Sequence, residues 1–167
     1  MRKIDKIWAS LEEDNVYSDG ILIRRYSNEV QPDIFVAIQE VGKIRSIGIS
    51  VEGIVSAKFN EISELEDIAI EITADPLSRN KRLILIKLVN KVHQDIFSVL
   101  CEDLIHSVWK LSDENLVVSA IVNRLSKWKS LFENAYKEGL TPEAQRGLFG
   151  ELYLLSNLIQ NDEHILE

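Results

Sequence analysis

The first apolar residues of the chain recur at intervals of three and four. At that spacing, one face of a helix collects Ile4, Ile7, Trp8 and Leu11. The stretch from Asp14-Asn15 to Asp19-Gly20 is rich in turn-forming residues, so the helix should end near it. The pattern therefore predicts a leading helix.

From residue 20 to about residue 89 the pattern changes to short runs rich in β-branched residues. Turn-forming residues separate the runs, at Gly20, Pro32, Gly42, Gly53 and Asp75-Pro76. Such runs at this spacing are typical of a mainly antiparallel sheet. We expect five or six strands, at residues 21–26, 34–39, 44–51, 54–59, 68–73 and 83–89.

Helical periodicity returns after Val92. One stripe contains Phe97, Leu100, Leu104, Val108 and Leu111. Ser112-Asp113 can cap the next helix, at about residues 116–137, and Gly139 closes it. Thr141-Pro142-Glu143 then opens a last helix that runs to about Gln160. The fold class is therefore α+β, with a leading helix, an antiparallel sheet and three C-terminal helices.

Composition narrows the class of protein. With 167 residues and 46% apolar content, the chain can bury the core of one domain, or of a small domain with an appended helical piece. The apolar runs, such as residues 83–86, are far shorter than the roughly 20 residues that cross a bilayer, and the first residues do not resemble a signal peptide. We expect a cytoplasmic protein. Cys101 is the only cysteine, so an intrachain disulfide and a thiolate metal cluster are excluded.

The formal net charge is −8, which disfavours binding to the phosphates of DNA. The basic residues form short clusters that we interpret as solvated surface: Arg24-Arg25, Arg79 with Lys81-Arg82, and Arg124 with Lys127 and Lys129.

The last predicted helix carries an acidic residue in its apolar arc. Glu151 lies among Ala144, Leu148, Leu152, Leu155, Leu158 and Ile159. A carboxylate in such a place must be neutralised, paired with a base, bound to a cation or able to reach water at the edge of the arc. Gly147 and Gly150 weaken a helix, which suggests that another backbone packs closely against them.

Residues 140–155, and above all their Gly-Leu-x-Gly-Glu-Leu-x-x-Leu segment, resemble a family of bacterial PD-(D/E)XK motif proteins found in restriction-like and phage-defence settings. A preceding helix with Trp128 and Phe132 fits the same family, whereas the sheet resembles it only in the order of elements. The resemblance implies three parts: an N-terminal sheet domain at residues 1–92, linking helices at 93–139, and the first helix of a truncated restriction-endonuclease-like core at 140–167.

In that family, the helix carrying this glutamate is followed by a strand with a catalytic Asp and another with Glu-x-Lys. Carboxylates there hold Mg²⁺, and the lysine activates the attacking water. Only Glu151 matches these positions: no Lys or Arg follows Arg146, and Asp162, Glu163 and Glu167 have no strand to carry them. We therefore expect that this chain does not cleave DNA alone, whereas a complete relative would be a Mg²⁺-dependent endonuclease.

Two further constellations imitate metal or catalytic sites. Asp33 with Glu40 and Lys43 resembles the PD-(D/E)XK signature, but Glu to Lys is three residues rather than two, which sends the side chains to opposite faces of a strand, and Gly42 suggests a turn. Glu102, Asp103 and His106 could share a helical face, but a bundle metal site needs a second such motif, so we expect an ion pair there. His93 and His164 have no partners at metal-ligand spacing.

Two hypotheses follow from the sequence. In the first, the chain is the recognition or assembly portion of a nuclease-like defence protein. Glu151 then serves as a metal-site or core-positioning residue once the missing strands are present, and DNA is contacted through that missing core. In the second, the chain is a stand-alone interaction module that binds a protein partner or a second copy of itself. Neither hypothesis involves a membrane.

Overall fold

The β-branched runs form a sheet in the computed structural model, which describes residues 2–14, 20–39, 43–53, 59, 67–137, 147 and 150. Its strands are β1 (Ile21–Arg25), β2 (Ile34–Gln39), β3 (Ile44–Glu52), β4 (Ile68–Ala74) and β5 (Lys81–Leu88). They lie in the order β1-β2-β3-β5-β4, and each of these pairings is antiparallel. The predicted strands at these places are confirmed.

The described helices are α1 (Lys3–Glu13), the short η2 (Lys91–His93), α2 (Gln94–Val108) and α3 (Glu114–Lys137). The predicted α+β class is thus confirmed, with a leading helix, an antiparallel sheet and helices after it. Most of the expected strand at 54–59 lies outside the described residues, and Phe59 itself is buried in a 3₁₀ turn. The expected last helix also lies outside them, apart from Gly147 and Gly150.

The chain divides into two compact units, Met1–Lys127 and Trp128–Glu167. The first contains the whole sheet with α1, α2 and the start of α3. The division at residues 92 and 139 that we drew from the sequence stays a prediction.

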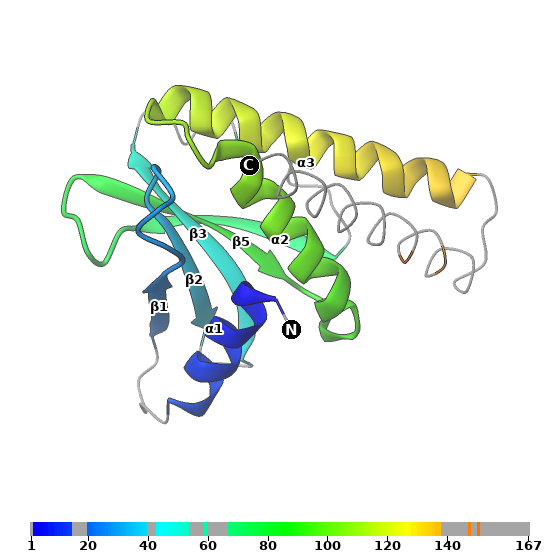
Figure 1. Ribbon diagram of the computed structural model, residues 1–167, viewed down its shortest axis with the longest axis horizontal. Helices are drawn as coiled ribbons and strands as arrows, with labels where there is room; N and C mark the ends of the chain where they lie inside the picture. The colour runs from blue at the N-terminus through cyan, green and yellow to red at the C-terminus, as the bar shows by residue number, and fades with distance from the viewer. Residues whose placement is uncertain are drawn as a thin grey trace, which may run out of the picture. The chain divides into compact units, whose positions relative to one another are not determined.

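Helices α1 and α2 lie across the same face of the sheet (Figure 1). Trp8 of α1 is fully buried and stacks on Phe97 of α2, with ring centroids 5.6 Å apart. The Trp8 indole Nε1 donates to the carbonyl oxygens of Ala37 and Ser46, at 3.2 and 3.1 Å. The leading helix is therefore fixed both to strands β2 and β3 and to α2.

The opposite face of the sheet is also apolar. Arg45 contacts Trp8 and Glu12 of α1, so side chains in register with Arg45 point toward that helix. The alternate side chains point away from it and form a cluster of Phe35, Ala37, Leu83 and Leu85, with Ile21 and Ile23 packed against them. Strands β2 and β5 bury side chains on both faces, which explains their continuous apolar sequences.

Asp113 caps α3 as predicted: its Oδ1 accepts a hydrogen bond from Leu116 N at 3.0 Å. Val117, Ile121 and Leu125 follow at intervals of four and are buried. Arg124 of α3 pairs with Asp103 of α2. None of the described helices is long and apolar enough to cross a membrane.

The expected close packing at Gly147 and Gly150 is wrong for the described structure. Both residues are exposed, and a Cβ atom built on either would meet nothing within 4 Å. Gly48 of β3 shows the opposite: a Cβ there would lie 2.9 Å from Leu83 Cδ1 and 3.4 Å from Leu85 Cδ2. Close packing therefore requires a glycine in the sheet, at position 48.

Substitution of Gly48 by alanine should destabilise the protein by about 1–3 kcal/mol, because the new methyl group overpacks the cluster around Leu83. Gly53→Ala is the matched control, since its Cβ would meet only Arg82 Cγ at 3.7 Å and should change stability by less than about 0.5 kcal/mol. Urea unfolding of both variants measures the difference. Equal free energies of unfolding would contradict the packing argument.

Tyr26 should make stability fall at alkaline pH. Burial, with a smaller contribution from Glu102, raises the pKa of Tyr26 to about 12. In the unfolded chain a tyrosine titrates near pH 10, so the unfolded state loses its proton first and stability declines as pH rises from about 10 toward 12. In urea unfolding between pH 8 and 11, Tyr26→Phe should lose less stability on alkalinisation than the wild type. Parallel curves for the two proteins would exclude this role.

Candidate functional site

Glu151, the one family-motif residue that the sequence singled out, lies outside the described residues. Its role as a metal-site or core-positioning residue therefore stays a prediction. The acids, bases and histidines described below all lie in the first unit.

Asp33 and Lys43 lie at opposite ends of β2. This position agrees with the conclusion from the sequence that they do not form a catalytic pair. Asp33 precedes the strand and Lys43 follows it in the turn to β3, with a φ of 46°. Six strand residues separate the two by roughly 20 Å. Lys43 Nζ instead donates to the Glu12 carbonyl at 3.0 Å. Glu40 is outside the described residues.

An open cavity of about 460 Å³ lies on the face of the sheet that α1 does not cover. It is lined by Ile23 and Arg25 of β1, Asp33 and Phe35 at the start of β2, Ser50 of β3, Asp75, Leu77 and Ser78 of the β4–β5 turn, and Lys81 at the start of β5. Antiparallel pairing brings these segments together at one end of the sheet.

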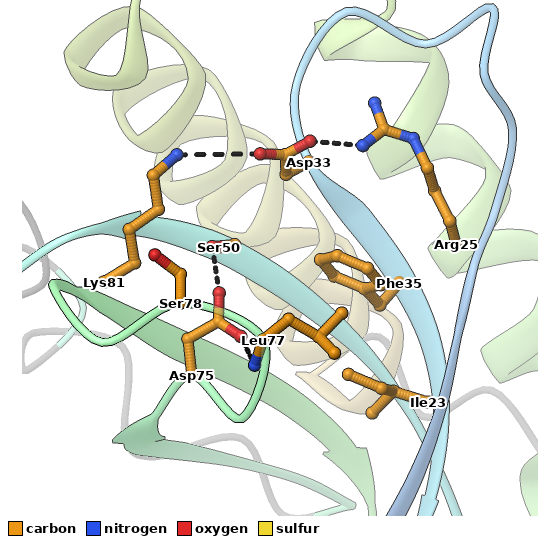
Figure 2. Close-up of a pocket in the computed structure, with 9 residues that line it drawn as sticks. All are labelled: Ile23, Arg25, Asp33, Phe35, Ser50, Asp75, Leu77, Ser78 and Lys81. Atoms are coloured by element: carbon orange, nitrogen blue, oxygen red, sulfur yellow. Dashed lines mark hydrogen bonds and ion pairs between the residues drawn. The ribbon is translucent and has the colours of Figure 1, made fainter.

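Ion pairs form the rim of the cavity. The Asp33 carboxylate lies between two cations: Oδ1 accepts from Arg25, and Oδ2 lies 3.6 Å from Lys81 Nζ (Figure 2). Lys81 also donates to Glu114 Oε1 at 2.9 Å, and the other Glu114 oxygen accepts from the backbone N–H of Glu52 at 2.7 Å. The hydrogen bond to Glu114 raises the pKa of Lys81, so the ammonium stays charged at neutral pH.

A second polar group lies deeper. Ser50 and Asp75 are buried, and the Ser50 hydroxyl donates to Asp75 Oδ2 (Figure 2). Asp75 Oδ1 accepts from the backbone N–H of Leu77 at 2.8 Å, which fixes the β4–β5 turn. The side chain of Leu77 is thereby held at the mouth, where the residue is 68% exposed.

Further charged groups of the first unit are also paired. Glu71 accepts from Lys87, and this hydrogen bond lowers the pKa of Glu71. Glu12 receives two bonds from Arg45, at 2.8 and 3.1 Å. Lysine and arginine side chains on several strands are therefore held in ion pairs with nearby acids.

Glu102 and Asp103 form ion pairs with arginines from outside the Glu102, Asp103 and His106 constellation. Glu102 lies 3.2 Å from Arg2, although burial raises the pKa of Glu102, and Asp103 accepts from Arg124. His106 stacks on Trp109, and its Nδ1 lies 2.8 Å from the Glu102 carbonyl oxygen. Cys101 is buried, and burial raises the pKa of its thiol well above the ordinary value.

Magnesium, which the family resemblance implies, does not fit the residues that the structure describes. Among them, no three Asp, Glu, His or Cys side chains gather as a metal ion requires. The two acids of the cavity already accept hydrogen bonds or ion pairs from Arg25, Lys81, Ser50 and Leu77. The described groups of this cavity therefore do not form a metal site.

Sequence reasoning did not find the cavity. It noted Asp75-Pro76 only as a strand separator, considered Asp33 only as a false motif, and treated Arg25 and Lys81 as solvated surface. The available signal was weak: Ser50 is a polar residue at the end of a buried strand, and Asp75 stands two residues before Leu77, the spacing of a side-chain-capped turn.

Residues 4–165 match a family model described as "Putative PD-(D/E)XK family member, (DUF4420)". The match includes the leading helix, the sheet, the described helices and the segment that contains Glu151. The chain matches no curated protein and no solved structure.

Ser50→Ala should destabilise the protein by about 1–3 kcal/mol, because it removes a hydrogen-bond donor from the buried Asp75 carboxylate. Ser78→Ala is the matched control: only the Ser78 backbone bonds to Asp75 and Lys81, and alanine keeps those bonds, so the change should be below about 0.5 kcal/mol. Thermal or urea unfolding distinguishes them. A Ser50→Ala protein as stable as the control would show that this hydrogen bond does not hold the turn.

Proposed function

The chain belongs to the PD-(D/E)XK family that this model describes, and from that premise we propose that it is the recognition and assembly portion of a nuclease-like defence protein. It works in the cytoplasm and does not cleave DNA by itself. Its first unit makes contacts with a substrate or partner, and Glu151 contributes to the nuclease core only together with strands that carry Asp and Glu-x-Lys.

The observation that carries this proposal is the pairing of charges in the first unit. Among the residues of this unit that the structure describes, seven carboxylates lie within ion-pair distance of a lysine or arginine: Glu12, Asp14, Asp33, Glu71, Glu102, Asp103 and Glu114. A divalent cation needs carboxylate oxygens that are free to coordinate it. Acids held by arginine and lysine are poor ligands, and cations held by acids are poor phosphate contacts. The arrangement supports specific recognition by a stable scaffold more than hydrolysis.

The family match supports the other half of the proposal. It spans the sheet and the Glu151 segment together, so the two belong to one family module. Within the 167 residues no Lys follows Glu151, so the sheet and Glu151 do not by themselves make up a Glu-x-Lys element. This division assigns recognition to the sheet and metal chemistry to the assembled core.

DNA cleavage tests the proposal. The purified 167-residue chain with Mg²⁺ or Mn²⁺ should leave plasmid and single-stranded DNA intact. A chimaera that adds the Asp and Glu-x-Lys strands of another family member should cut, and Glu151→Gln should lower its rate by about 10²-fold or more, the scale of losing a group that acts on the metal or its surroundings.

Glu163→Gln in the same chimaera is the control and should keep the parent rate, since Glu163 lies outside the matching motif. Cleavage by the unextended chain that EDTA abolishes would refute the proposed inactivity. A fully active Glu151→Gln chimaera would show that Glu151 does not act in the core.

A further inference from the structure

The cavity between β1, β2, β3 and the β4–β5 turn is an open pocket that no role yet accounts for. Its volume of about 460 Å³ lies within the range of small-molecule sites, roughly 300–1,000 Å³. Apolar walls and a few convergent polar groups, here Ile23, Phe35 and Leu77 with the Arg25-Asp33-Lys81 rim, are typical of such sites (Figure 2).

Charge decides which ligands fit. The lining contains two bases, Arg25 and Lys81, and two acids, Asp33 and Asp75, and Glu114 also binds Lys81. A phosphate or carboxylate would have to compete with carboxylates that the fold already places against both cations. A metal ion or amine would face the same two cations. Electrostatics therefore disfavours a charged ligand of either sign.

Hydrogen-bonding capacity excludes a wholly apolar ligand. Arg25 has five N–H donors, and three of its hydrogen bonds go to Ser27, Val30 and Asp33. Lys81 has three donors and contacts two carboxylates, and each Asp33 oxygen has a second lone pair. The rim thus offers donors and acceptors side by side, and an apolar group would remove them from water without replacement.

An uncharged ligand with apolar faces and an edge of alternating donors and acceptors satisfies both conditions. Nucleobases have this chemistry. We propose that the cavity binds a nucleobase, its faces against Leu77 and Ile23 and its polar edge at the Arg25-Asp33-Lys81 rim. The inference rests on the proposed recognition function and names its ligand class.

This mode of binding suits an acidic protein. Contacts to phosphates give nucleic-acid proteins their affinity and salt dependence, whereas contacts to bases give specificity. A net charge of −8 disfavours contacts to phosphates, but it does not disfavour contacts to uncharged bases. A pocket for one base lets this portion select a substrate whose backbone another part of the protein holds.

The test is an NMR titration of the 167-residue chain with uncharged adenosine, guanosine, cytidine, thymidine and uridine, without metal. At least one nucleoside should shift the amide signals of Ser50, Leu77, Ser78 and Lys81 saturably. Because an uncharged ligand releases no counterions, its Kd should change by less than about twofold between 50 and 200 mM salt, and a 5′-phosphate should not tighten binding.

Leu77→Asp places a charge at the mouth and should weaken binding by about tenfold or more, since it puts an anion against the ligand's apolar face. Leu116→Asp makes the same change at another exposed leucine, outside the pocket. Its Kd for the nucleoside should stay within about twofold of the wild-type value. A short single strand with the preferred base, compared with one that is abasic there, shows whether the base comes from a polymer or from a free nucleoside.

Each of the following results would overturn the inference: no nucleoside shifts the pocket signals, a nucleotide binds only through a steep salt-dependent contact, or both leucine variants weaken binding equally. Binding of an uncharged glutamine peptide in place of every nucleoside would assign the pocket to a protein partner and also overturn it. The cleavage experiments use DNA and metal and do not depend on this titration, so the two proposals can fail separately.

Discussion

The first unit depends on the burial of one indole. Trp8 lies between the sheet and α2, and its single N–H is shared by carbonyl oxygens from two adjacent strands. A buried indole N–H without an acceptor would cost about 1–3 kcal/mol, so the ring can enter the core only in this orientation. That orientation fixes α1 on β2 and β3. It leaves the other face of the sheet as the place where a ligand site can form.

Much of this arrangement was predictable because it follows from local periodicity. The spacing of Ile4, Trp8 and Leu11 predicted α1, and Asp113 predicted the start of α3. Runs of β-branched residues between turn residues predicted the five described strands. These signals depend on residues within one segment, and hydrophobic burial then selects the antiparallel sheet with helices after it.

The cavity could not be predicted in the same way, because its interacting polar groups are 8 (Arg25 and Asp33) to 48 (Asp33 and Lys81) residues apart in sequence. Asp33 meets Arg25 through the β1–β2 hairpin, but it meets Lys81 only because β5 pairs with the distant strand β3 as well as with its sequence neighbour β4. Strand order is a global outcome of packing. The family motif around Glu151, by contrast, is contiguous and could be recognised in the sequence, although the described structure does not reach it.

In the β4–β5 turn, the residues that stabilise the backbone differ from the residues that are exposed to a ligand. Its conformation is set from inside, by the buried Asp75 carboxylate and the Ser50 hydroxyl, whereas Leu77 and Arg79 are exposed. Exposed substitutions usually change stability by less than about 0.5 kcal/mol. Mutations can therefore accumulate on the outer surface of this hairpin while its backbone keeps the same path, and relatives of this chain could diverge in what they select without having to rebuild the scaffold.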